Sequence, residues 1–288
     1  EPREINHVGM LGAGLMGAGI ATVLADKGVT VRLKDLSDDA LSGAYKYAKK
    51  VFSKARRRKR YGTAGLEERT ARISGGLDYA GFGHAEIVIE AVLEDMGLKR
   101  KMVADIEAAT HSEAIFATNT SALPIAEIAA EAKHPERVIG MHFFNPVPVM
   151  KLVEVVRGLA TSDATYETVR ELSEGLGKVP VEVNDAAGFV SNRVLMPMIN
   201  EAIFCVHEGV ATPEAVDTVM KLGMAHPMGP LTLADFIGLD TCLAIMRVLH
   251  EGLGDSKYRP CPLLVQHVDA GWLGKKAGRG VYRYDAPA

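Results

Sequence analysis

Hydrophobic and polar positions follow two different patterns along the chain. Up to about residue 186, short apolar runs rich in β-branched residues alternate with longer stretches of helical periodicity. The short runs predict strands and the longer stretches predict helices, so we expect a mostly parallel sheet with helices on its faces. The expected strands cover residues 7–11, 29–33, 86–92, 114–118, 138–142, 151–156 and 180–183.

The pattern changes near residue 186, where strand signals stop and helical periodicity continues. Helices are expected over residues 189–208, 213–222, 231–251 and 262–270. The sequence therefore predicts an α/β domain over residues 1–186, followed by an all-α domain over residues 187–288.

Composition and charge exclude several classes of protein. The 288 residues carry 33 Lys and Arg against 36 Asp and Glu, a net charge of -3 that gives no reason to expect nucleic acid or an anionic membrane as partner. Cys205, Cys242 and Cys261 are widely separated, which is typical of reduced thiols rather than disulfides or a metal site. Without a visible signal peptide or membrane span, we expect a cytoplasmic protein. A processed organellar protein is the alternative, since the chain begins with Glu1.

A glycine-rich motif follows the first expected strand. Gly12-Ala13-Gly14-Leu15-Met16-Gly17 has the GxGxxG spacing and precedes an expected helix, as in Rossmann-type domains that bind a dinucleotide pyrophosphate. Asp35 closes the second strand, where a carboxylate binds ribose hydroxyls and repels a 2′-phosphate. The motif thus predicts NAD binding, with NADP disfavoured although Lys34 precedes the acid. A simple glycine-rich turn is the alternative.

Two polar residues in apolar strands suggest acid–base chemistry. His142 ends the strand 138–142, at the edge of a parallel sheet where ligands bind. Glu154 interrupts the apolar strand 151–156, and a buried carboxylate needs a partner. An imidazole would serve, and the carboxylate would raise its basicity and fix its tautomer. We expect a His142–Glu154 dyad; the alternative is an unrelated buried ion pair.

Two further polar segments are candidates for ligand contact. Asn119-Thr120-Ser121 follows the strand 114–118, where it could contact a ligand or cap a helix begun near Pro124. Asn192 opens the first helix of the second domain, where it could face a cleft or be exposed.

One strong charge run stands out at residues 54–60, with six basic residues in seven. Such runs are usually solvated, and nucleic acid is a standard partner. The run is short and lacks interleaved aromatic residues, so a phosphorylated cosubstrate is the favoured partner.

Taken together, these motifs resemble the L-3-hydroxyacyl-CoA dehydrogenase family, in the family's order and over essentially the whole chain. The matching segments are residues 12–17, 90–94, 119–121, 142–146, 188–193 and 274–280. The resemblance implies an NAD-binding Rossmann-type domain and a helical C-terminal domain that mediates homodimerisation. It also implies oxidation of a short-chain L-3-hydroxyacyl-CoA, or the reverse reduction, with no metal.

The resemblance assigns a role to individual residues. His142 matches the catalytic histidine and Glu154 its acid partner, while Ser121 and Asn192 match residues that contact the substrate oxygens. The expected NAD contacts are Gly12, Gly14, Leu15, Met16, Gly17, Asp35, Glu94, Lys99, Ser121, Asn145 and Lys276. The expected contacts with coenzyme A are Lys54, Arg58, Ser121 and Asn192.

Two groups within the family share features with the chain. Residues 1 to about 110 look like the dehydrogenase portion of multifunctional fatty-acid oxidation proteins, whereas the stretch from residue 143 resembles stand-alone 3-hydroxybutyryl-CoA dehydrogenases. We expect a single-activity enzyme of mosaic character, since the length leaves no room for a hydratase domain. The alternatives are an L-gulonate-type hydroxyacid dehydrogenase and a non-catalytic, crystallin-like NAD-binding protein.

Overall fold

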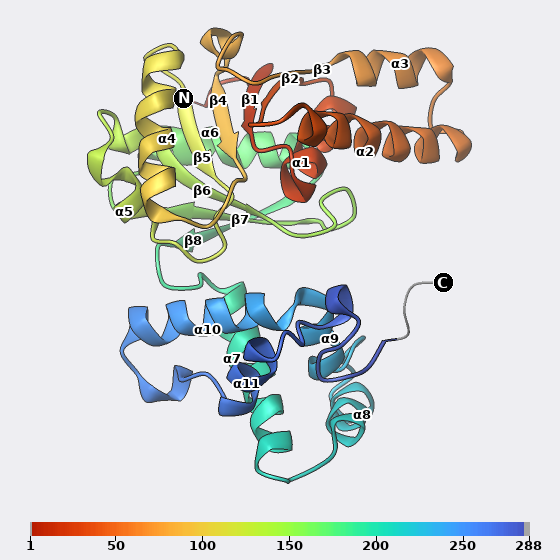
Figure 1. Cartoon of the computed structure of the whole chain (residues 1–288). Helices are drawn as coiled ribbons and strands as arrows, with labels where there is room; N and C mark the ends of the chain where they lie inside the picture. The colour runs from red at the N-terminus through yellow and green to blue at the C-terminus, as the bar shows by residue number, and fades with distance from the viewer. Residues whose placement is uncertain (1, 285–288) are drawn as a thin grey trace. The chain divides into compact units, whose positions relative to one another are not determined.

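The computed structural model describes residues 2–284 of the chain. The chain divides into two compact units, Glu1–Asp185 and Ala186–Ala288. In Figure 1 the first unit runs from red to green and combines a sheet with helices, whereas the second runs from green to blue and is helical. The α/β class of the first part and the helical class of the second are thus confirmed.

The first unit is built on one eight-stranded sheet with the order β3-β2-β1-β4-β5-β6-β7-β8. Every neighbouring pair is parallel except β6 and β7, which are antiparallel. The strands are β1 (His7–Leu11), β2 (Thr30–Lys34), β3 (Ile73–Gly76), β4 (Ile87–Glu90), β5 (Ile115–Thr118), β6 (Val138–Phe143), β7 (Leu152–Arg157) and β8 (Val179–Asn184).

Six helices accompany this sheet: α1 (Leu15–Asp26), α2 (Asp38–Arg57), α3 (Thr63–Ala71), α4 (Met96–Ala109), α5 (Ile125–Ile128) and α6 (Asp163–Gly175). Apolar residues of α1 and α6 share one core with alternate residues of the strands, such as Met10, Ile89 and Met141. The two helices therefore cover one face of the sheet, while α5 lies on the other, where its Ile125 approaches Gly140 of β6.

The sequence predicts seven of these strands to within a few residues but not β3. Residues 73–76 read Ile-Ser-Gly-Gly, which lacks the β-branched and aromatic residues that mark a strand. The segment becomes a strand because it pairs with β2 at the edge of the sheet, with Ile73 opposite Val31. Tertiary pairing, rather than local propensity, decides its conformation.

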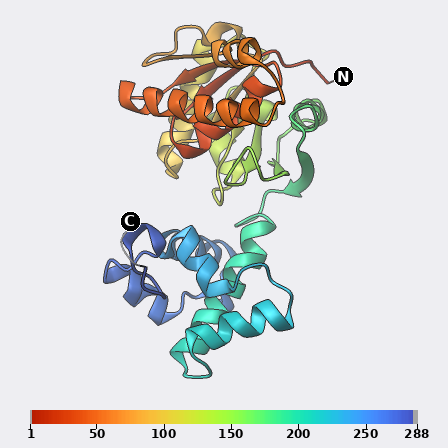
Figure 2. The ribbon, with the colours of Figure 1, turned by 90° about the vertical axis from the view of Figure 1, so that its right-hand side faces the viewer.

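Within residues 186–284 the second unit is built of helices, as the cyan and blue ribbon in Figure 2 shows. Its helices are α7 (Ser191–His207), α8 (Pro213–Gly223), α9 (Pro230–Ile237), α10 (Leu239–Leu253) and α11 (Pro262–Asp269). The prediction of one helix over residues 231–251 is wrong, because Gly238 has φ +106° and separates α9 from α10. Only glycine adopts such a conformation readily, and it ends the helical hydrogen bonding there.

The sheet topology decides where functional residues gather. Because β1, β4, β5 and β6 run in the same direction, their carboxyl ends meet at one edge, where ligands bind in open α/β sheets. No helix within residues 2–284 has the length and apolar character required to cross a membrane.

Candidate active site

The glycine-rich loop between β1 and α1 has the backbone geometry that a dinucleotide pyrophosphate requires. Gly12 has φ +92°, and a Cβ added there would lie 2.4 Å from the carbonyl oxygen of Ala91. A Cβ at Gly17 would lie 1.8 Å from the carbonyl oxygen of Gly12. Gly14, the N-cap of α1, instead has nothing within 4 Å of its added Cβ. Two glycines therefore allow the tight turn, and the third leaves room for a ligand at the helix N-terminus.

Asp35 lies beside this loop at the end of β2. Its carboxylate accepts hydrogen bonds from the main-chain N–H groups of Ala13, at 2.7 Å, and Leu36, at 2.6 Å. The neighbouring Lys34 places its ammonium 4.8 Å from the ring centre of Tyr79. The carboxylate of Asp35 is therefore bound to the glycine loop, whereas the ammonium of Lys34 lies against the ring of Tyr79. These residues fit NAD and disfavour a 2′-phosphate.

His142 and Glu154 form a buried pair on adjacent strands. They stand directly opposite each other in the antiparallel pair β6–β7, and the Nδ1 atom of His142 lies 2.8 Å from Oε2 of Glu154. The residues are 6% and 2% exposed. Opposed residues share a face of the sheet, and here this is the α5 face, since Ile139 and Met141 belong to the core with α1. The sequence predicts this contact, and the register of the strands produces it.

The segment after β5 is tied to both neighbouring strand ends. Oδ1 of Asn119 accepts the main-chain N–H of Phe143 at 2.8 Å, which links the segment to the residue that follows His142. The carboxylate of Glu94, in the loop after β4, accepts the main-chain N–H of Ser121 at 2.9 Å and the hydroxyl of Thr120. Ser121 is thus held between the ends of β4 and β6, on the sheet edge that also carries His142.

A buried ion pair lies next to this edge of the sheet. Glu90 at the end of β4 and Lys99 of α4 are 0% and 1% exposed, with Nζ 2.6 Å from Oε1. The same ammonium lies 3.4 Å from Oε2 of Glu94, and the hydroxyl of Thr118 donates to Glu90. Lys99 therefore joins two glutamates, one of which holds Ser121. Sequence reasoning missed Glu90, although an acid inside an expected apolar strand, here 86–92, is the same signal that singled out Glu154.

The short helix α5 after Ser121 receives its cap from far along the chain. Asp185 accepts the main-chain N–H groups of Ile125, at 2.9 Å, and Ala126, at 2.7 Å. The cap of this helix, which the sequence attributes to residues 119–121, is thus supplied by the last residue of the first unit. No local signal could have found a partner sixty residues away.

The loop between β6 and β7 carries the expected cofactor contact Asn145. Asn145 is exposed and precedes Pro146 through a cis peptide bond. Val147, two residues on, is 1% exposed and packs against α1, where a Cβ at Gly19 would lie 3.0 Å from it. The loop is thus packed against the dinucleotide-binding helix while Asn145 stays accessible.

The basic run lies at the C-terminal end of α2, where its charged side chains are exposed. Lys54 and Arg58 are four residues apart and so lie on one side of the helix end. Within residues 2–284 neither forms an ion pair, whereas Arg60 lies 3.8 Å from Asp26. Lys54 and Arg58, which the sequence assigns to a phosphate of the substrate, are therefore not neutralised by a carboxylate in the described structure.

Two expected contacts belong to the helical unit. Asn192, in the first turn of α7, is 8% exposed, so the alternative of an exposed position is wrong, and the role of its amide in a cleft stays a prediction. Lys276 lies in a single 3₁₀ turn, with Nζ 2.7 Å from Oδ1 of Asp240.

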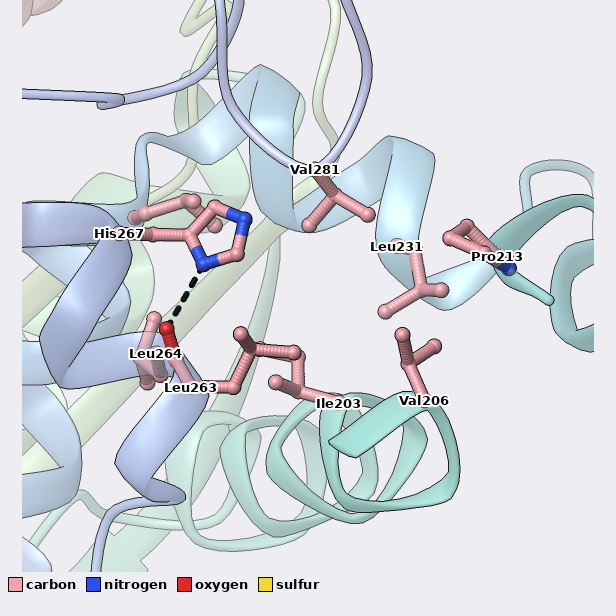
Figure 3. A pocket seen from close by; sticks show the side chains of 9 residues that line it. Ile203, Val206, Pro213, Leu231, Leu263, Leu264, His267 and Val281 are labelled. Atoms are coloured by element: carbon pink, nitrogen blue, oxygen red, sulfur yellow. Dashed lines mark hydrogen bonds between the residues drawn. The ribbon is translucent and has the colours of Figure 1, made fainter. Parts of the chain in front are cut away.

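The helical unit also contains a small apolar cavity, drawn in Figure 3. Its volume of about 70 Å³ is well below the roughly 300 Å³ or more of small-molecule sites. His267 lines it, and its Nδ1 lies 2.7 Å from the carbonyl oxygen of Leu263, so this nitrogen carries the proton. In this cavity the histidine is paired with a main-chain carbonyl and not with a carboxylate, unlike His142.

Sequence models of one family match both units. The model described as 3-hydroxyacyl-CoA dehydrogenase, NAD binding domain, matches residues 7–186. The model described as 3-hydroxyacyl-CoA dehydrogenase, C-terminal domain, matches residues 188–284.

Individual relatives agree with these matches. The chain is 57% identical over 282 residues to a probable 3-hydroxybutyryl-CoA dehydrogenase of Bacillus subtilis (strain 168), covering 98% of each chain. It is 44% identical over 287 residues to the fatty acid oxidation complex subunit alpha of Vibrio campbellii, covering 99% of this chain and 40% of that protein. The crystal structure of (S)-3-hydroxybutyryl-CoA dehydrogenase from Ralstonia eutropha matches with a TM-score of 0.95 and 46% identity, covering 98% of this chain and 100% of that one.

The similarity to the Bacillus protein and the similarity to the Vibrio protein each cover nearly the whole chain. Neither is confined to the N-terminal or the C-terminal part. The glycine loop, Asp35 and the His142–Glu154 pair lie in the unit that the NAD-binding domain model matches. The chain belongs to the 3-hydroxyacyl-CoA dehydrogenase family and carries its NAD-binding domain.

Proposed function

We propose that this chain interconverts L-3-hydroxybutyryl-CoA and acetoacetyl-CoA with NAD as hydride carrier. The observation that carries the proposal is the buried contact of 2.8 Å between His142 and Glu154, on the sheet edge that also bears the glycine loop. The full-length relatives in Bacillus and Ralstonia, both described as 3-hydroxybutyryl-CoA dehydrogenases, support the short-chain substrate.

His142 acts as the general base of the oxidation. Because Nδ1 faces the Glu154 carboxylate, Nε2 is the nitrogen that takes the proton of the 3-hydroxyl group as the C3–O bond becomes a carbonyl. The chemistry that NAD supplies when bound is acceptance of the hydride that leaves C3. Glu154 stabilises the resulting imidazolium and holds the ring in one tautomer. In the reverse direction, the imidazolium returns the proton to the oxygen.

Ser121 and Asn192 orient the oxygens of the substrate. The position of Ser121 supports this role, because Glu94 holds its main-chain N–H on the edge that bears His142. Hydrogen bonds to the 3-oxygen and the thioester oxygen matter most where polarity changes in the transition state.

The first unit holds most of the cofactor contacts. The loop of Gly12, Gly14 and Gly17, with Leu15 and Met16 in the first turn of α1, receives the pyrophosphate, and Asp35 binds the adenosine ribose. Glu94, Ser121 and Asn145 line the nicotinamide end, and Lys276 contributes from the helical unit. Lys99 is fully buried, which supports a contribution through Glu94 rather than through an exposed ammonium.

Lys54 and Arg58 bind a phosphate group of coenzyme A. Their exposure at the end of α2 supports this role, since exposed basic side chains bind phosphate with little desolvation cost.

We also propose a homodimer formed by the helical unit. Large apolar side chains are exposed there, including Val194 at 68%, Leu222 at 83% and Phe236 at 56%. Exposed apolar side chains mark an interaction surface where they form a contiguous patch. Sedimentation velocity tests this: a monomer at micromolar concentration would contradict it.

The free cysteines fit a reducing compartment such as the cytoplasm.

One assay tests the activity and separates its alternatives. NADH oxidation is followed at saturating cofactor with acetoacetyl-CoA, with free acetoacetate and with a sugar acid such as 3-keto-L-gulonate. We expect turnover with the CoA ester alone. Turnover with the sugar acid alone would favour the gulonate-type enzyme. NADH binding without turnover of any substrate would favour a non-catalytic protein.

A further inference from the structure

A buried lysine holds the loop that joins the two strands of the His142–Glu154 pair. Lys178 follows the C-terminus of α6, where its main-chain N–H donates to the carbonyl of Ser173 at 3.0 Å. Its side chain is buried, and Nζ donates to the carbonyl oxygens of Val147 at 2.5 Å and Met150 at 2.7 Å. Within residues 2–284, these carbonyls are the polar partners of the ammonium, and no carboxylate pairs with it.

A buried ammonium without a carboxylate is costly, so its presence requires an explanation. Burial lowers the pKa of Lys178, with no charged neighbour contributing. The same contacts satisfy two carbonyl groups of a loop that has no strand partner of its own. A neutral apolar side chain would leave both carbonyls unpaired.

The clamped loop connects three functional features. It begins after Phe143, the residue that follows His142, presents Asn145 and ends before the strand of Glu154. Its buried Val147 touches α1 at Gly19, one turn beyond the glycine loop. The side chain of Val147 thus fixes the loop to the dinucleotide-binding helix, while its carbonyl fixes the loop to Lys178.

We propose that Lys178 is a positioning residue for the cofactor, which acts by holding the 144–151 loop so that Asn145 meets the nicotinamide end. The inference rests on the proposed function for the role of Asn145, but Lys178 itself touches only the loop. Its effect should therefore appear in NADH binding and should depend on Asn145.

A double-mutant cycle on NADH affinity tests the proposal. Lys178→Met keeps the length of the side chain and removes the donors, Asn145→Ala removes the presented amide, and the double variant combines them. We expect each single variant to raise the Kd for NADH by about tenfold, and the double variant to raise it by far less than the product, because the second change acts on an interaction already lost. Lys151→Met, an exposed lysine at the end of the same loop, is the matched control and should stay within about twofold of wild type.

The outcomes separate this inference from the activity. A Kd for Lys178→Met within twofold of wild type would overturn the positioning role. Full additivity with Asn145→Ala would also overturn it, because it would mean that Lys178 acts independently of Asn145. Should Lys178→Met not fold, Lys178→Gln replaces it in the same cycle under the same criteria. NADH binding is measured without substrate, so failure of the wild type to reduce acetoacetyl-CoA would refute the proposed function and leave this test intact.

Discussion

Glu154 stands directly opposite His142 on the antiparallel neighbour of β6, with its carboxylate 2.8 Å from Nδ1 of the imidazole. Among the strands of residues 2–284, this is the one antiparallel pair in an otherwise parallel sheet. The pairing brings an acid from the middle of one strand against a histidine near the carboxyl end of another. The histidine therefore has a fixed partner at the edge where ligands bind.

Replacing Glu154 tests what its charge contributes. Glu154→Gln keeps a hydrogen-bonding side chain of the same size but removes the charge that stabilises an imidazolium. We expect kcat for acetoacetyl-CoA reduction to fall by roughly 10² while KM for NADH changes little, since acid–base catalysis is typically worth 10² to 10⁴. Glu182→Gln, on the exposed side of β8, is the control. Unchanged kcat in Glu154→Gln would reduce the pair to a structural contact.

Asp35 should decide between the two nicotinamide cofactors. Its carboxylate faces the glycine loop, and a 2′-phosphate placed there would meet a like charge. We expect wild-type kcat/KM for NADH to exceed that for NADPH by about 10² or more, and Asp35→Ser to lower the ratio by about tenfold. Asp39→Ser on α2 should leave the ratio as it is. Equal use of both cofactors by the wild type would contradict this assignment.

Glu90 should be important for stability as well as for the site. Glu90→Gln leaves the fully buried ammonium of Lys99 with only the more distant Glu94. We expect the free energy of unfolding in urea to fall by about 3–5 kcal/mol, the usual cost of an unpaired buried charge. Glu67→Gln, exposed on α3, is the control.

The double variant Glu90→Gln/Lys99→Met should recover part of the loss, because it removes the buried charge along with its partner. Two results would contradict this role of the Glu90–Lys99 pair in stability. One is a loss of unfolding free energy below about 1 kcal/mol in Glu90→Gln, and the other is a double variant less stable than Glu90→Gln.

The sequence predicts what depends on local pattern. The glycine loop, seven strands and the His142–Glu154 contact follow from periodicity and from the need of a buried acid for a partner. The rest depends on distant partners: β3 forms by pairing with β2, Asp185 caps α5, and Lys178 clamps a loop that no hydrophobic pattern marks. The break at Gly238 was also hidden, because α9 and α10 share one helical periodicity.

The three thiols should differ in reactivity. Cys242 and Cys261 are fully buried, and burial raises the pKa of both thiols, that of Cys242 to about 12. Raised pKa values keep these thiols protonated at pH 8, whereas Cys205 is partly exposed. We expect 5,5′-dithiobis(2-nitrobenzoic acid) to modify one thiol per native chain at pH 8 and three in denaturant. Rapid reaction of native Cys205→Ser would contradict this assignment.

The most direct test of the account compares wild type and His142→Gln in NADH-dependent reduction of acetoacetyl-CoA, with NADH affinity measured on the same samples. His84→Gln, at the opposite edge of the sheet, is the control histidine. The account predicts that His142→Gln lowers kcat by roughly 10² or more, with NADH affinity within about threefold of wild type. Full turnover by His142→Gln would contradict the assignment of His142 as the acid–base residue, and with it the proposed mechanism.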